Sequence, residues 1–135
     1  MTNKEKALTL ISTFASGDTK TAASLLAEGY IQHNLSYGTG RDAFLSSVEY
    51  LAAAPVKTTV ENIRAFEDGD KVFLQTVYNF AGAGDQVAFD IFCFDENGLI
   101  AEHWTTLHLW QPLTHLDTHR LMDRIPERQK RTENL

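Results

Sequence analysis

The chain has 135 residues, of which 43% are hydrophobic and 22% charged, and its formal net charge is −6. This length predicts one domain with a buried core. The acidic balance argues against a nucleic-acid partner, and no apolar run reaches the roughly 18 residues of a membrane helix. The N-terminal residues do not resemble a secretory signal. Because Cys93 is the only cysteine and a reducing compartment suits it, we expect a cytoplasmic protein without membrane contact.

The N-terminal third of the sequence predicts helices. Residues 3–16 place apolar side chains at helical spacing. A second helix is expected to start with Thr19 or Thr21 as its cap and to end at Gly29. A third helix is capped by Asp42 and ends at the next proline along the chain.

The region from residue 56 to residue 110 predicts strands. It alternates and is rich in Val, Phe, Ile and Thr, with turn residues near 68–70, 82–85 and 97–98. These turns divide it into four long consecutive strands in a meander. Helices followed by an antiparallel sheet form an α+β arrangement. Strands this long twist and curl strongly, so that helices can pack against the concave side.

The segment VAFDIFCF, residues 87–94, is apolar on both of its alternating faces. A strand that is apolar on both sides is covered on both sides. We expect the helices to cover one face and a second subunit to cover the other. Trp104 and Trp110 alternate onto the outer face of the next strand, which supports a homodimer through this surface.

Two titratable residues, Asp90 and His103, interrupt the apolar arms of the last predicted hairpin. A four-residue loop sets Asp90 opposite His103, whereas a two-residue Asn-Gly turn sets Asp90 opposite Thr105 and Phe92 opposite His103. In both registers Asp90, His103 and Thr105 share an apolar face with Phe92 and Leu107. A three-residue loop with a bulge would shift the register. The alternative to a reactive pair is a structural hydrogen bond between two buried polar groups.

Strict alternation assigns the first residues of the last strand to its two faces. Leu99 and Ala101 are expected on the inner face with His103, and Ile100 and Glu102 on the outer face.

The C-terminal tail offers one candidate metal pair, His115 and His119, which are four residues apart and share a face if this part of the tail forms a short helix. A metal site needs at least a third ligand, and none lies nearby in the sequence. The basic residues between 128 and 131 are flanked by Glu127 and Glu133, which is typical of a solvated end. We therefore expect no metal and no cofactor.

The chain resembles SnoaL-like members of the nuclear-transport-factor-2-like superfamily, which includes polyketide cyclases and ketosteroid isomerase. The resemblance rests on ASGD at 15–18, YIQHN at 30–34 followed by GRDAF at 40–44, and DIFCFDENGLIAEHW at 90–104. It implies a cone in which a curved antiparallel sheet wraps around N-terminal helices, with one deep pocket and a homodimer. We expect a single domain over residues 1–135, with its core over about 3–110 and an extension over 111–135.

The resemblance also implies roles for individual residues. It places YIQHN at the pocket mouth, where the ketosteroid isomerase branch has its general base and this chain has His33. Asp90 matches the oxyanion-hole Asp of that branch, which an apolar site keeps neutral. The oxyanion tyrosine of the branch falls near Leu10, which argues against steroid isomerisation. Many SnoaL-like sequences carry an Asp after EHW, where this chain carries Thr105, a residue unable to act as an acid or base near neutral pH.

Three functions are compatible with the sequence. The first is a small-molecule enzyme, a cyclase, isomerase or related lyase or hydrolase, in which His33 or the Asp90–His103 pair moves a proton next to a carbonyl. The substrate would be an apolar or carbonyl-bearing molecule. The predicted pocket contains Tyr30, Asn34, Phe92, Thr105 and Leu107, although Asn34 suits a turn equally well. The second is a non-catalytic binding module with the same cone, and the third is a dimeric assembly role.

Overall fold

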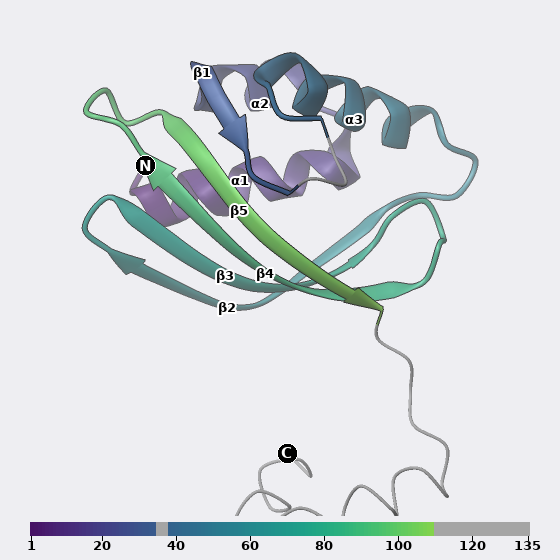
Figure 1. Ribbon diagram of the computed structural model, residues 1–135. Coiled ribbons are helices and arrows are strands. Elements are labelled where there is room, and N and C mark those ends of the chain that lie inside the picture. Colours follow the sequence, from purple (N-terminus) through teal and green to yellow (C-terminus); the bar gives the residue numbers. More distant parts are fainter. Residues whose placement is uncertain (35–37, 110–135) are drawn as a thin grey trace, which may run out of the picture.

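The computed structural model describes residues 1–34 and 38–109, and it consists of three helices on one face of a curved sheet (Figure 1). The helices are α1 (Asn3–Ser16), α2 (Thr19–Leu25) and α3 (Arg41–Ala53). The strands are β1 (Leu26–Gln32), β2 (Thr59–Asp68), β3 (Lys71–Asn79), β4 (Asp85–Phe94) and β5 (Ile100–Leu109). The predicted α+β class with a curved sheet against N-terminal helices is confirmed.

The sheet has the strand order β1-β5-β4-β3-β2. Strands β2 to β5 pair antiparallel with their sequence neighbours, which confirms the predicted meander. Strand β1 joins the β5 edge in parallel orientation, so that Gln32 lies beside His103. The residues between α2 and α3 therefore reach the strand that carries His103.

The first helix has a cap at each end. The Thr2 hydroxyl accepts from the Glu5 N–H while the Glu5 carboxylate accepts from the Thr2 N–H, which forms a capping box. At the C-terminus Gly17 has a φ of 74°, and its N–H donates to the Thr13 carbonyl. This left-handed conformation is one that glycine adopts without steric cost.

The boundaries of the other two helices differ from the predicted ones. The cap of α2 is Asp18, whose carboxylate accepts from a backbone N–H in the first turn, rather than one of the predicted threonines. The helix ends at Leu25 instead of Gly29, because the next residues pair with β5. The cap of α3 is Gly40, and the predicted cap, Asp42, lies in the first turn instead.

The hydrophobic core lies between the helices and the concave face of the sheet. Fully buried side chains from α1 and α3 meet fully buried side chains from β3, β4 and β5; among them are Leu10, Val48, Val72, Phe92 and Ile100. Polar side chains on this face are consequently shielded from bulk water, which raises the cost of leaving them without a partner.

The β4–β5 pairing fixes which residues face the core. Asp90 pairs with Thr105 and Phe92 pairs with His103. This is the register that a two-residue turn predicts, but the loop is longer. The Asp95 N–H donates to the Leu99 carbonyl over 2.8 Å, which encloses three residues.

A β-bulge compensates for the longer loop. Cys93 pairs with Glu102 and Phe94 pairs with Ile100, so Ala101 is an extra residue on β5. The bulge lets Ile100 and His103 face the core together, and both are buried. The expectation that Ile100 shares the outer face with Glu102 is therefore wrong, because strict alternation fails at the bulge.

Candidate functional site

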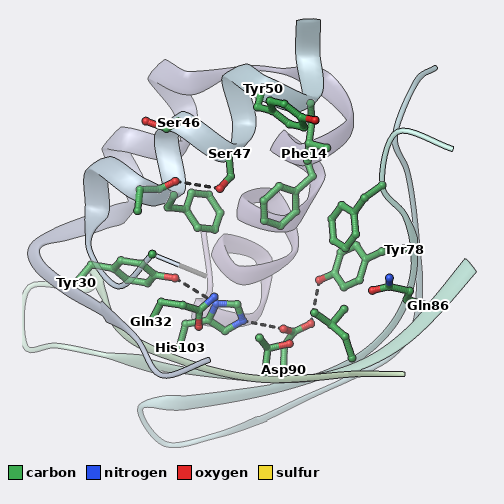
Figure 2. Close-up of a pocket in the computed structure, with 17 residues that line it drawn as sticks. Phe14, Tyr30, Gln32, Ser46, Ser47, Tyr50, Tyr78, Gln86, Asp90 and His103 are labelled. Atoms are coloured by element: carbon green, nitrogen blue, oxygen red, sulfur yellow. Dashed lines mark hydrogen bonds and ion pairs between the residues drawn. The ribbon is translucent and has the colours of Figure 1, made fainter. Parts of the chain in front are cut away.

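A cavity of about 530 Å³ lies between the helices and the sheet (Figure 2). Its apolar wall is largely aromatic and includes Phe14 from α1, Phe44 and Tyr50 from α3, and Phe80 after β3. Its polar wall includes Tyr30, Gln32, Tyr78, Asp90, His103 and Thr105. A cavity of this size, apolar with a few converging polar groups, is typical of a small-molecule site.

Asp90 and His103 meet in the wall of this cavity. The Nε2 atom of His103 lies 2.7 Å from Oδ1 of Asp90, and these residues are only 3% and 2% exposed. The residues lie on neighbouring strands and face the helices. The ring of Phe92 stacks on the imidazole with centroids 4.1 Å apart and planes at 12°, which fixes the orientation of the imidazole. The residues that interrupt the apolar hairpin thus form one buried pair.

Two tyrosine hydroxyls extend the pair into a chain of four side chains (Figure 2). The hydroxyl of Tyr30, on β1, lies 3.1 Å from Nδ1 of His103. The hydroxyl of Tyr78, on β3, donates to Oδ2 of Asp90 over 2.9 Å. Each imidazole nitrogen and each carboxylate oxygen therefore has a hydrogen-bond partner inside the wall.

The tyrosines are held in their neutral form. Burial raises the pKa of both hydroxyls, and the nearby charge of Asp90 raises the pKa of each further. As neutral donors they fit one assignment that satisfies all four groups. The Asp90 carboxylate accepts from Tyr78 and from the Nε2–H of His103, while Nδ1 of His103 accepts from Tyr30.

His33 lies outside this cluster, contrary to the expectation that it converges with Asp90 and His103. Its ring stacks on Trp104 with centroids 3.8 Å apart and planes at 12°, and its Nε2 lies 3.9 Å from Oε1 of Glu102. Alternation along the end of β1 is the cause, because Gln32 faces the cavity and the next side chain points to the other side of the sheet.

The other predicted pocket residues divide into two groups. Tyr30, Thr105 and Leu107 line the cavity. Phe92 is fully buried behind the imidazole of His103 and is not part of the described lining. The side-chain amide of Asn34 donates to the backbone carbonyl of Thr105 over 3.4 Å, which ties the end of β1 to β5.

Several lining residues were not predicted. Tyr78 and Gln75 lie on a strand with apolar residues on both faces, so alternation alone left open which of them faces inward. The structure places Tyr78 in the cavity and Gln75 on the other face, where its side chain accepts from Arg64. Phe14 and Phe44 belong to the apolar faces of amphipathic helices, which is the signal that could have identified them. Nothing in the sequence pattern singles out Gln32.

The Gln32 side chain has an unsatisfied acceptor at the cavity. Its Oε1 atom is buried and accepts no hydrogen bond from the residues that the structure describes. Buried polar atoms are normally paired. A donor group on a ligand, or a water molecule, would satisfy this oxygen.

The outer face of the sheet carries an exposed apolar patch. Phe66, Phe73, Phe89 and Trp104 are between 39% and 62% exposed on neighbouring strands. They line a second hollow of about 340 Å³. Cys93 lies on this same face, and burial raises the pKa of its thiol, so it is not an activated nucleophile.

Metal ligands do not gather within residues 1–34 and 38–109, where no three His, Cys, Asp or Glu side chains form a group that could hold an ion. The candidate pair His115 and His119, the basic tail and Trp110 lie outside the described residues. In the same two ranges no helix is long and apolar enough to cross a membrane.

Comparisons with known proteins identify the family and agree with the fold. The sequence profile of the SnoaL-like domain family matches residues 7–103. No curated protein matches the sequence.

Similar solved structures share the fold at low sequence identity. One is an NTF2-like protein of unknown function from Cytophaga hutchinsonii, with a TM-score of 0.68 and 17% identity over 80% of this chain and 91% of that chain. Another is a cystatin-fold protein from Novosphingobium aromaticivorans, with a TM-score of 0.68 and 15% identity over 78% and 98% of the two chains. A third is a candidate ketosteroid isomerase from Kribbella flavida, with a TM-score of 0.68 and 18% identity over 92% and 90%.

Proposed function

The chain belongs to the SnoaL-like domain family, and from this premise we propose that it is an enzyme that moves a proton next to a carbonyl group of an apolar small molecule. The observation that carries the proposal is the 2.7 Å contact between Asp90 and His103 in the wall of a largely aromatic cavity. A buried acid–base pair beside space for a ligand is the arrangement that general acid–base catalysis requires. Isomerisation and ring closure through an enolate are the reactions that such a pair supports.

The charge of the cavity wall favours an uncharged substrate. Asp90 is the only acidic residue of the described lining, and this part of the wall contains no Lys or Arg to match a carboxylate or phosphate. Carrying a second negative charge into an apolar cavity beside Asp90 is costly without a cation. A neutral ketone or enol fits the wall, with its rings against the aromatic side chains.

A second candidate function is a binding module without catalysis. Two points favour it: the family resemblance implies an acidic residue at the position of Thr105, and every acid–base atom of the Asp90–His103 pair already has a partner. A fully satisfied buried network also stabilises a fold without reacting.

One experiment separates the two candidates. A panel of neutral carbonyl compounds, including cyclic 1,3-diketones, β,γ-unsaturated ketones and aryl ketones, is tested for thermal stabilisation and for turnover. We expect at least one compound to raise Tm and to react, and Asp90→Asn to lower its turnover by 100-fold or more. Stabilisation without turnover would identify a binding module, and neither response from any compound would contradict both candidates.

A further inference from the structure

The hydrogen bonds around His103 raise the question of which atom meets the substrate. Its Nε2 faces Asp90 and its Nδ1 faces Tyr30, while the two carboxylate oxygens of Asp90 face His103 and Tyr78. The ring of Phe92 covers one face of the imidazole. Neither nitrogen can accept a substrate proton unless its existing hydrogen bond is broken first.

We propose that Tyr30 is the catalytic residue through which the Asp90–His103 pair exchanges protons with the substrate. Tyr30 lines the cavity, and its hydroxyl lies 3.1 Å from Nδ1 of His103 (Figure 2). Tyr30, His103 and Asp90 then form a relay of hydroxyl, imidazole and carboxylate, in the roles that these groups have in a hydrolase triad. The inference rests on the proposed function and identifies its reacting atom.

The geometry favours Tyr30 over the other hydroxyl of the network. Tyr78 donates to the carboxylate of Asp90, whereas Tyr30 contacts the imidazole. Burial raises the pKa of both tyrosines, so that either transfer is uphill, but an ordinary phenol titrates roughly 3.5 pH units above an imidazole and roughly six above a carboxyl group. Proton transfer from Tyr30 to His103 is therefore the less uphill of the two. It also forms an imidazolium that bonds to the adjacent Asp90 carboxylate, which stabilises the charge.

The relay balances without an additional reactant. A C–H bond next to the substrate carbonyl breaks, and its proton goes to Oη of Tyr30 as the hydroxyl proton of Tyr30 passes to Nδ1 of His103. The C–H electron pair forms the carbon–carbon double bond of the enolate, and the carbonyl π pair moves to oxygen. The imidazolium keeps its Nε2–H bond to Asp90. The reverse transfer returns the proton to the same carbon or to another one.

The resting relay makes a prediction that needs no substrate. In the wild-type protein at neutral pH, ¹⁵N NMR of His103 should show a protonated Nε2 and an unprotonated Nδ1. Tyr30→Phe should then shift the Nδ1 resonance, because its donor is lost, and Tyr78→Phe should leave it in place. A protonated Nδ1 in the resting protein would overturn the relay, since it could not accept from Tyr30.

The role of the relay in catalysis is tested by measuring kcat and KM with a compound from the carbonyl panel. Tyr30→Phe should lower kcat by 100-fold or more with KM within threefold, and Tyr78→Phe, which removes a hydroxyl from the same network, should lower kcat by less than tenfold. Tyr30→Phe with more than a tenth of the wild-type kcat would overturn the relay but leave the proposed function intact. If the wild type turns over nothing, the proposed function fails, and the catalytic role of Tyr30 fails with it whatever the state of Nδ1.

Discussion

The buried hydroxyls of Tyr30 and Tyr78 make the free energy of unfolding depend on pH in the alkaline range. Both residues are 2% exposed, and burial raises both pKa values above the ordinary value near 10. Above that pH the unfolded chain releases tyrosine protons that the folded protein still holds. The free energy of unfolding therefore falls as pH rises, by up to about 1.4 kcal/mol per pH unit for each of these tyrosines. Below pH 10 this contribution is fully present.

The variant Tyr78→Phe should flatten this dependence. Phenylalanine has no proton to release in either state, so one of the two contributions disappears. Urea unfolding between pH 9.5 and 11 measures the slope for the wild type and the variant. Identical slopes would show that the Tyr78 hydroxyl ionises as easily in the folded protein as in the unfolded chain.

At the scale of the elements, the bulge at Ala101 allows Ile100 and His103 to lie on the same face of the sheet. Deleting Ala101 restores strict alternation while Glu102 stays outside and His103 inside, because the extra residue has no partner on β4. We expect this deletion to change the free energy of unfolding by about 1 kcal/mol or less, an amount typical of a mild substitution.

A matched insertion should have the opposite effect. One alanine added between Glu102 and His103 moves His103, Thr105 and Leu107 to the outer face. Burying outward-facing groups and exposing core ones should cost about 3 kcal/mol or more. Chemical denaturation compares the two variants, and an insertion as well tolerated as the deletion would refute the register.

Elements with a strong local pattern were predictable from the sequence. The alternation and turn residues of residues 56–110 predicted the β2–β5 meander, and helical spacing predicted α1 with its observed bounds. The bulge was not predictable, since one extra residue leaves the composition of a strand unchanged. The end of α2 was missed because parallel pairing with β5, a contact distant in sequence, converts residues after Leu25 into a strand.

The site was predictable to the same degree. Asp90 and His103 lie on the two strands of one hairpin, so counting residues from the turn placed them on the same face. The position of His33 depends on how β1 joins the sheet edge, which no local pattern encodes. The contact between Tyr30 and His103 was missed for the same reason, because these two residues are 73 positions apart in the sequence.

At the scale of the whole molecule, one face of the sheet packs against the helices and the other carries an exposed apolar patch. We propose that a second copy of the chain covers the exposed face, because Phe66, Phe73, Phe89 and Trp104 form a larger apolar surface than isolated surface residues do. The molecular mass in solution should then be twice the 15.2 kDa of one chain.

A charge at the centre of this surface should separate the subunits. Phe89→Glu is expected to give a monomer by light scattering, because an unpaired carboxylate cannot be buried at low cost. Val56→Glu is the matched control, since Val56 is 52% exposed in the loop after α3 and lies away from the sheet face. A wild type that is monomeric, or a Phe89→Glu variant that stays dimeric, would rule out this interface.

Proton transfer by the Asp90–His103 pair is tested most directly by exchange of the α-protons of a ketone from the panel in D₂O. Deuterium incorporation, followed by ¹H NMR, should proceed at the wild-type rate within threefold in His33→Ala, because this imidazole lies on the other side of the sheet against Trp104. The rate should fall by 100-fold or more in Asp90→Asn. Exchange that is unaffected by Asp90→Asn, or lost as completely in His33→Ala, would contradict the account.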